Sequence, residues 1–135
     1  TLLLRCDEIP ASLIIAQAIN ESNWGKSRFA IQAHNLFGEH CFTKSCGLIS
    51  KSNPKIQVKK FPNINASLIS YIYNLNTNSN YSKFRMLRSI SRRNKEKLLG
   101  INLVNGLLFY SIKKQEYIKN IKLIIIKYDL QKYDF

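Results

Sequence analysis

Glu21 is the residue of this sequence whose surroundings most favour acid–base chemistry. It stands in NESNWGKSRFA, residues 20–30, within a chain of 135 residues that carries a formal net charge of +13. Apolar residues at helical spacing predict a helix over 9–22, so Glu21 falls in the last turn, where the helix dipole disfavours an anion. If Trp24 covers the carboxyl group, desolvation raises its pKa further, which suits a proton donor. The alternative is a solvated glutamate paired with a neighbouring cation.

A second group of reactive side chains lies in HNLFGEHCFTKSC, residues 34–46. His34, His40, Cys41 and Cys46 are enough ligands in principle for zinc, although their spacing is not that of a zinc finger or ribbon. Cys41 and Cys46 can instead close a small loop as a disulfide or stay reduced, which leaves Cys6 as an unpaired, buried thiol. Because no serine or cysteine nucleophile motif accompanies the histidines, a hydrolytic triad is not predicted.

The elements that must position these residues are mainly helices. Gly25 suits the left-handed position that ends the first helix. Residues 35–61 lose the helical period, and the alternation of Ile56 and Val58 with polar residues predicts turns and a small β-hairpin. Further helical periodicity covers 65–75, 83–90, 101–110 and 116–126. These patterns predict one mainly helical α+β domain over residues 1–135.

Composition limits the classes of protein to consider. With 45% apolar residues the chain can fill one core, and its apolar runs are shorter than the ~20 residues that cross a bilayer, so a soluble domain is expected. No secretory signal is visible at the start of the sequence. The positive charge favours polyanions, but charge runs are usually solvated surface, and no zinc-finger or RNP-type motif predicts a nucleic-acid partner.

Several separated motifs resemble one known family. IPASLIIAQAINESNWGKSRFA, followed by HNLFGEHCF, resembles the bacterial peptidoglycan-hydrolysing β-N-acetylglucosaminidases, the flagellar-type glucosaminidase domain. That family's pattern is a helix ending in A-x-x-E-S-x-W-G-x-S and then N-L-F-G. The likeness is closest to its Bax-like branch and continues in order through SYIYNLNTNSNYSKFRMLR, GLLFYS and EYIKNI, so it covers about residues 9–130.

The resemblance implies a lysozyme-like fold, with a helical lobe, a small β-hairpin lobe at about 38–61 and a glycan groove between them. It implies an endo-β-N-acetylglucosaminidase that cleaves the β-1,4 glycan backbone of peptidoglycan, with Glu21 as the general acid. The alternative function is a catalytically decayed domain that only binds peptidoglycan or acts as a scaffold. The intact E-S-x-W-G-x-S motif argues against decay.

The group that partners Glu21 is the main open question of the sequence. Family members often carry another acid in the β lobe, but CGLISKSNPKIQVKKF, residues 46–61, contains none. Glu39, directly after NLFG, is the candidate second carboxylate, and an exposed turn residue is the equal alternative. A substrate's own acetamido oxygen is the remaining possibility, with a tyrosine to orient it. The resemblance makes Tyr110 the first choice for that catalytic-site hydroxyl.

Other residues are candidates for the substrate groove, with a structural role as the alternative. They are Trp24, Asn35, Phe37, Tyr81 and Tyr117. For Phe37 and Tyr117 packing is the favoured alternative, and residues 35–38 are expected to form a turn that shapes the groove.

The resemblance also favours the Cys41–Cys46 disulfide, which suits an oxidising periplasm. Peptidoglycan glycan strands are the expected partner of a monomer in peripheral contact with the cell wall. No nucleic acid, cofactor or metal is expected. The expected location is the periplasm or cell envelope, with any signal or anchor segment outside this sequence.

Overall fold

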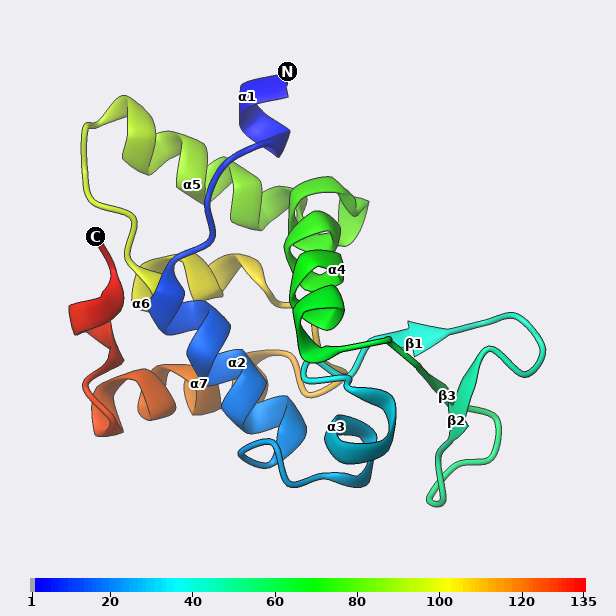
Figure 1. The fold of residues 1–135 in the computed structure, drawn as a ribbon. Helices are drawn as coiled ribbons and strands as arrows, with labels where there is room; N and C mark the ends of the chain where they lie inside the picture. Colours follow the sequence, from blue (N-terminus) through cyan, green and yellow to red (C-terminus); the bar gives the residue numbers. More distant parts are fainter. Residues whose placement is uncertain (1) are drawn as a thin grey trace. The chain divides into compact units, whose positions relative to one another are not determined.

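The computed structural model describes residues 2–135 and consists mainly of helices (Figure 1). The longer helices are α2 (Ala11–Ser22), α4 (Ile64–Thr77), α5 (Ser82–Arg93) and α7 (Gln115–Lys127). The short helices are α1 (Leu2–Arg5), α3 (Arg28–Ala33), α6 (Gly100–Leu103) and the 3-10 turns η1 (Ser79–Tyr81), η2 (Val104–Gly106) and η3 (Leu130–Tyr133). The strands are β1 (His40–Cys41), β2 (Gly47–Ile49) and β3 (Gln57–Lys59). The predicted mainly helical α+β class is confirmed. Within the described chain, every helix is too short or too polar to cross a membrane.

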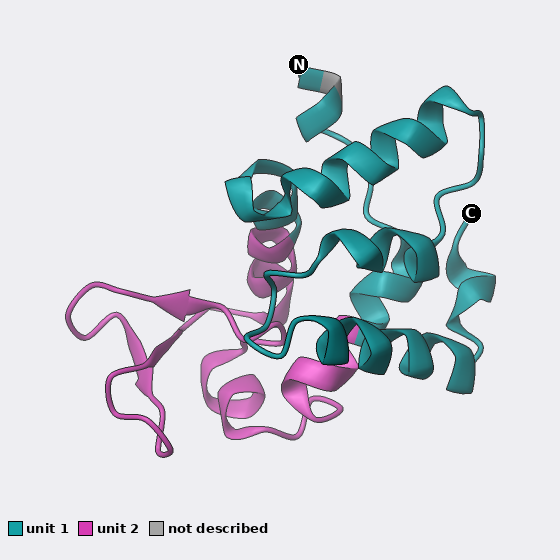
Figure 2. Cartoon of the chain, turned by 180° about the vertical axis from the view of Figure 1, so that it is seen from behind, with its two compact units in different colours: residues 1–16, 72–135 teal, residues 17–71 magenta. Residues whose placement is uncertain are grey.

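The chain divides into two compact units (Figure 2). Unit 1 combines the segment up to residue 16 with residues 72–135, and unit 2 comprises residues 17–71. Helices α2 and α4 each contribute residues to both units. Unit 2 is therefore a continuous stretch of sequence, whereas unit 1 is assembled from two separate stretches.

Unit 1 is built from helices that bury one apolar face each. In α7 the buried residues Tyr117, Ile118, Ile121 and Ile125 follow the helical period, which places them on one side of the helix. They share the core with residues of α2, α5, α6 and the turns after it. Other buried apolar side chains of unit 1 include Leu13, Ala16, Leu75, Phe84, Leu98, Leu103, Val104 and Leu107.

The predicted helix over 101–110 is wrong beyond residue 106. Helix α6 and turn η2 end at Gly106, and the chain continues through turns to Lys114. A Cβ atom on Gly106 would lie 2.3 Å from the Cα atom of Phe84. This close contact with α5, together with the low helix propensity of glycine, ends the helix where the apolar pattern alone would extend it.

A buried carboxylate near the end of the chain joins three distant parts of unit 1. The Oδ1 atom of Asp134 accepts a hydrogen bond from the backbone N–H of Ser12 at 2.8 Å. Its Oδ2 atom accepts from the Ser12 hydroxyl at 2.6 Å and from the N–H of Gly100 at 3.0 Å. Because Ser12 lies in the first turn of α2 and Gly100 begins α6, one carboxylate satisfies N–H groups at the start of two helices.

Unit 2 contains a three-stranded antiparallel sheet with the order β1-β3-β2. Val58 in the central strand pairs with His40 of β1 and Leu48 of β2. The prediction was a two-stranded hairpin; β2 and β3 form it, and β1 adds the third strand. Val58 is buried, as its alternation with polar neighbours predicts. The core of this unit also contains Ala30, Ala33, Phe37, Phe61 and Tyr71.

The segment between α1 and α2 corrects one prediction. Cys6 is a free cysteine, as expected, but its predicted burial is wrong because the side chain is exposed. The guanidinium group of Arg88 donates hydrogen bonds to the backbone carbonyls of residues 4, 7 and 8. The segment is thus held through its backbone, which leaves the thiol outside the core.

Candidate active site

Glu21 is the penultimate residue of α2 and is partly buried. The last turn of α2 contains no basic residue. Next to it, the buried Ser22 hydroxyl donates to the carbonyl of Ala18 at 2.5 Å and accepts from the N–H of Gly25 at 2.8 Å. These bonds fix the chain at the point where α2 ends, so the predicted place of Glu21 in the last helical turn is confirmed.

The chain leaves α2 through three residues with left-handed backbone angles. Their φ values are 48° for Asn23, 60° for Trp24 and 76° for Gly25. Gly25 is therefore left-handed as predicted, although the reversal begins two residues earlier. Trp24 has an exposed fraction of 51%, so the chain presents an aromatic surface three residues after Glu21.

Residues 35–39 form a tight turn around a buried amide. The Oδ1 atom of Asn35 accepts hydrogen bonds from the N–H groups of Phe37 at 3.3 Å and Glu39 at 3.2 Å. Its Nδ2 atom donates to the carbonyls of Glu39 and Lys59, both at 2.9 Å. Because the side chain is 2% exposed, its amide is committed to shaping the turn.

This turn brings the backbone against the carboxylate of Glu21. Gly38 has a φ angle of 70°, and a Cβ atom built on it would lie 3.2 Å from the Oε2 atom of Glu21. Glycine is thus required twice at this position, by the left-handed angle and by the space that the carboxylate occupies. The NLFG segment and the helix end, 13 or more residues apart in the sequence, meet at this contact.

A buried polar pair lies in the same unit, one helical turn before Glu21. Gln17 is completely buried and accepts a hydrogen bond from the Tyr71 hydroxyl through its side-chain oxygen. Phe37 stacks on the Tyr71 ring with centroids 4.1 Å apart. Phe37 therefore serves the core, and the pair connects α2 to the turn that holds Gly38. The sequence analysis missed Gln17 and Tyr71; a polar residue four positions before Glu21, on the same helix face, was the available signal.

Glu39 has its carboxylate held at both oxygens. Oε2 accepts a hydrogen bond from the Ser70 hydroxyl at 2.6 Å, and Oε1 lies 3.9 Å from the Lys59 ammonium group. The side chain is 27% exposed, so it is neither the fully exposed turn residue nor a buried acid. Glu39 lies one residue after Gly38, in the same unit as Glu21.

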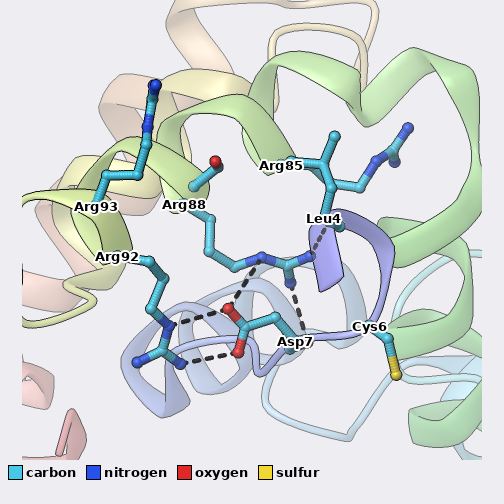
Figure 3. Close-up of a pocket in the computed structure, with 8 residues that line it drawn as sticks. Leu4, Cys6, Asp7, Arg85, Arg88, Arg92 and Arg93 are labelled. Atoms are coloured by element: carbon cyan, nitrogen blue, oxygen red, sulfur yellow. Dashed lines mark hydrogen bonds and ion pairs between the residues drawn. The ribbon is translucent and has the colours of Figure 1, made fainter. Parts of the chain in front are cut away.

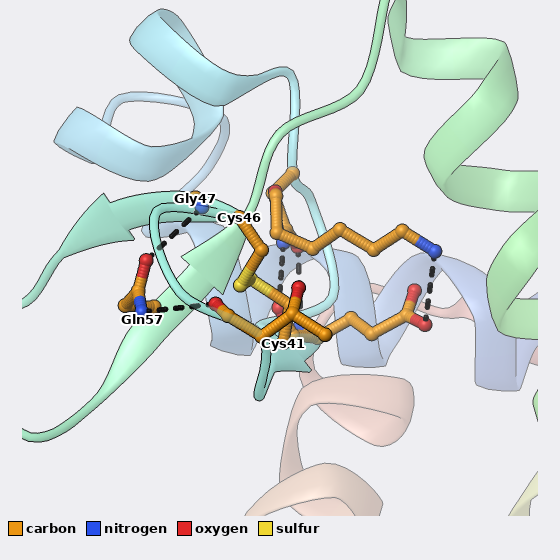
Figure 4. The surroundings of a disulfide bond; sticks show 8 residues. Cys41, Cys46, Gly47 and Gln57 are labelled. Atoms are coloured by element: carbon orange, nitrogen blue, oxygen red, sulfur yellow. Dashed lines mark hydrogen bonds and ion pairs between the residues drawn. A yellow bond between two sulfur atoms is a disulfide. The ribbon is translucent and has the colours of Figure 1, made fainter.

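The predicted disulfide between Cys41 and Cys46 is present, with Cα atoms 6.1 Å apart (Figure 4). Gln57 of β3 stabilises the loop that the disulfide closes. Its Oε1 atom accepts a hydrogen bond from the N–H of Gly47, and its Nε2 atom donates one to the carbonyl of Thr43. The bonded sulfur atoms are not available to zinc. Among residues 2–135, no group of three or more histidine, cysteine or acidic side chains is arranged to hold a metal ion.

Unit 1 brings the three predicted tyrosines together. The Tyr110 ring is partly buried, stacks on Tyr117 at 5.5 Å between centroids and meets Tyr81 at 5.8 Å. Tyr81 and Tyr117 are 7% and 3% exposed. Two rings thus support the third, so Tyr110 is the member of the cluster with surface left for a ligand.

Comparisons with known proteins agree with these features. Residues 3–130 match the model of the glucosaminidase family, described as mannosyl-glycoprotein endo-beta-N-acetylglucosaminidase. Protein bax of Escherichia coli (strain K12) is 35% identical over 120 residues, which are 87% of this chain and 42% of that protein. The chain thus spans about two fifths of the length of that relative. The catalytic domain of the autolysin Auto from Listeria monocytogenes has a similar fold, with a TM-score of 0.66, 26% identity and coverage of 91% of this chain and 74% of that one.

Proposed function

Because the chain belongs to the glucosaminidase family, we propose that it is a peptidoglycan hydrolase that cleaves the β-1,4 glycan backbone as an endo-β-N-acetylglucosaminidase. The observation that carries this proposal is the partly buried carboxylate of Glu21, placed at the end of α2 with the Gly38 backbone against its Oε2 atom. The similarity to an autolysin catalytic domain supports the substrate class. Proposed partners are peptidoglycan glycan strands in the periplasm or cell envelope, bound by a monomer.

In the proposed mechanism Glu21 acts as the general acid. Its carboxyl group donates a proton to the glycosidic oxygen, so that the leaving sugar departs as a neutral alcohol. A carboxyl oxygen must be held steadily for this transfer, because proton donation depends on hydrogen-bond geometry. The Ser22 bonds and the Gly38 contact provide that restraint from two sides.

For the second catalytic group we propose assistance by the substrate's acetamido oxygen, which attacks the anomeric carbon while Glu21 protonates the leaving oxygen. Both oxygens of Glu39 already have protein partners, Ser70 and Lys59, which suits a supporting role for this carboxylate. Tyr110 is the proposed hydroxyl that orients the acetamido group, since it is partly exposed and backed by two rings.

The half-exposed ring of Trp24 is the proposed wall for a sugar, because aromatic faces suit the apolar faces of carbohydrates. We propose that four buried residues position the exposed groups and do not contact the substrate directly. They are Asn35, Phe37, Tyr81 and Tyr117.

Activity on purified peptidoglycan tests the assignment of Glu21. We expect Glu21→Gln to lose nearly all release of new reducing ends while its circular dichroism and unfolding midpoint stay close to those of the wild type. The matched control is Glu96→Gln, which makes the same change at an exposed residue of unit 1 and should retain full activity. Equal activity in the two variants would refute the role of Glu21.

The alternative of a decayed binding domain is tested with the same proteins. If the wild type sediments with insoluble peptidoglycan but releases no reducing ends, the chain binds without cleaving.

If the wild type is active, replacing Glu39 with glutamine distinguishes the two catalytic schemes. Substrate assistance predicts a loss of less than about tenfold, whereas a paired carboxylate predicts a loss comparable to that of Glu21→Gln.

A further inference from the structure

Unit 1 contains a cavity of about 540 Å³ whose walls are rich in arginine (Figure 3). It is formed by α1, the segment that follows it and one face of α5. Arg85, Arg88, Arg92 and Arg93 line it, together with Ser89 and Leu4. These four arginines and Ser89 define what we call the arginine pocket. None of the residues proposed for catalysis belongs to it.

Among the described residues, acids match two of the four guanidinium groups, those of Arg88 and Arg92. Arg92 donates to both oxygens of Asp7, at 3.0 and 2.8 Å, and also to Glu8. Arg88 lies 4.0 Å from Asp7 through its Nε atom. Figure 3 shows Arg88 and Arg92 reaching toward Asp7, whereas the guanidinium groups of Arg85 and Arg93 point away from it.

Arg85 and Arg93 therefore keep their positive charges without a carboxylate partner. Within the described part of the chain, the hydrogen bonds that Arg85 donates go to the backbone carbonyls of Leu75 and Asn78, at 3.0 and 2.8 Å. Arg93 has no hydrogen bond or ion pair from its side chain to any other described residue. Carbonyl oxygens satisfy donors but do not neutralise a charge, so the pocket carries an excess of two positive charges.

Of the two uncompensated charges, that of Arg85 is buried and therefore costly, whereas Arg93 is exposed. Arg85 is 4% exposed and Arg88 is 1% exposed. Burial is the main cause that lowers the pKa of both guanidinium groups, and the nearby positive charge of Arg5 lowers that of Arg85 further. A buried charge that lacks a counter-ion is unfavourable, and an anion in the cavity would relieve the cost.

We propose that the arginine pocket binds a phosphoryl group carried by a larger organic molecule. A phosphoryl group offers up to about two negative charges and three acceptor oxygens, so it matches a cavity lined by four guanidinium groups and carrying excess positive charge better than a single carboxylate does. The Ser89 hydroxyl supplies a further donor. The cavity is larger than a phosphate ion, and the Leu4 side chain provides an apolar wall for the attached group.

Titration of the intact chain with glycerol 3-phosphate at constant ionic strength tests this site. We expect saturable binding in calorimetry and a rise in unfolding temperature that follows the ligand concentration. Arg93→Gln should weaken the affinity by about tenfold or more, since it removes one charged donor. The control Lys119→Gln removes one exposed charge from α7 and should leave the affinity unchanged. Non-saturable binding, or equal weakening in both variants, would overturn the proposal.

A second arm identifies the source of the phosphoryl group. Vesicles of phosphatidylglycerol in phosphatidylcholine are compared with vesicles of phosphatidylcholine alone. If Arg93→Gln lowers flotation with the anionic vesicles while Lys119→Gln does not, the pocket takes a lipid headgroup. If only glycerol 3-phosphate binds, and does so through Arg93, the pocket takes a soluble or polymer-linked phosphoryl group. Absence of both forms of Arg93-dependent binding refutes the site.

Discussion

Replacing Gly38 with alanine should impair catalysis beyond its effect on stability. The methyl group would start 3.2 Å from the Oε2 atom of Glu21, closer than most such contacts, so the carboxylate must shift by a few tenths of an ångström. A misplacement of about 1 Å costs on the order of 100-fold in rate. If the logarithm of the rate falls in proportion to the displacement, a shift of about 0.3 to 0.4 Å predicts a loss of about fivefold in kcat.

Gly25 offers a matched control for the cost of the backbone conformation. Its φ angle of 76° is close to the 70° of Gly38, but a Cβ atom built on Gly25 has nothing within 4 Å. Alanine at either position must adopt the left-handed region, which costs about 1 kcal/mol in free energy of unfolding. The two variants should therefore be equally destabilised in urea denaturation, and only Gly38→Ala should have the fivefold lower rate.

The rate is measured as reducing ends released from purified peptidoglycan at saturating substrate, well below the unfolding midpoint of either variant. Since both proteins are then folded, their stability loss does not contribute to the comparison. Equal rates for Gly38→Ala and Gly25→Ala would show that the contact with the Glu21 carboxylate does not position the acid. A lower rate for Gly25→Ala would contradict the reasoning more directly.

Three further predictions concern stability. Cys46→Ser opens the loop closed with Cys41 and should lower the free energy of unfolding by about 2 kcal/mol; added reductant should then destabilise only the wild type in urea. The hydrogen bond from Arg92 is the main cause that holds the pKa of Asp7 below its ordinary 3.8. The stabilisation that ionised Asp7 provides should be complete above its ordinary pKa and should vanish as the pH falls through its folded-state pKa. The free energies of unfolding of the wild type and Asp7→Asn, measured by urea titration, should therefore converge at acid pH. Divergence there would contradict this assignment. Asn35→Ala leaves backbone groups of the turn unpaired and should cost about 2 kcal/mol in urea denaturation, while a change below about 0.5 kcal/mol would count against its structural role.

Local patterns in the sequence predicted the elements that depend on local chemistry. The apolar period before Glu21 and the glycine after it were enough to place that carboxylate in the last turn of α2. The disulfide was favoured by family resemblance and is present. The helix predicted over 101–110 was overextended because its end depends on contact with Phe84, a residue of another helix. An apolar period carries no information about such a contact.

The supports of the candidate site were harder to predict. Gln17 and Tyr71 are 54 residues apart, and each alone has the features of an ordinary core or surface residue. Asn35 was predicted as part of a turn and as a groove residue, but its role in holding the turn to β3 was not, because one of its four hydrogen bonds goes to a strand residue 24 positions away. Side-chain pairs that form across a fold have no period in the sequence, so only the three-dimensional structure reveals them.

The hydrogen bonds of Asp134 have a consequence for folding during synthesis. Residues 17–71 form a continuous unit, so a ribosome has produced all of them before much of unit 1 exists. The hydrogen-bond partner of the Ser12 N–H group is synthesised 122 residues later. The N–H group of Gly100 donates to the same carboxylate. On the nascent chain, unit 2 can therefore form first, while the start of α2 is completed only after residue 134 has left the exit tunnel.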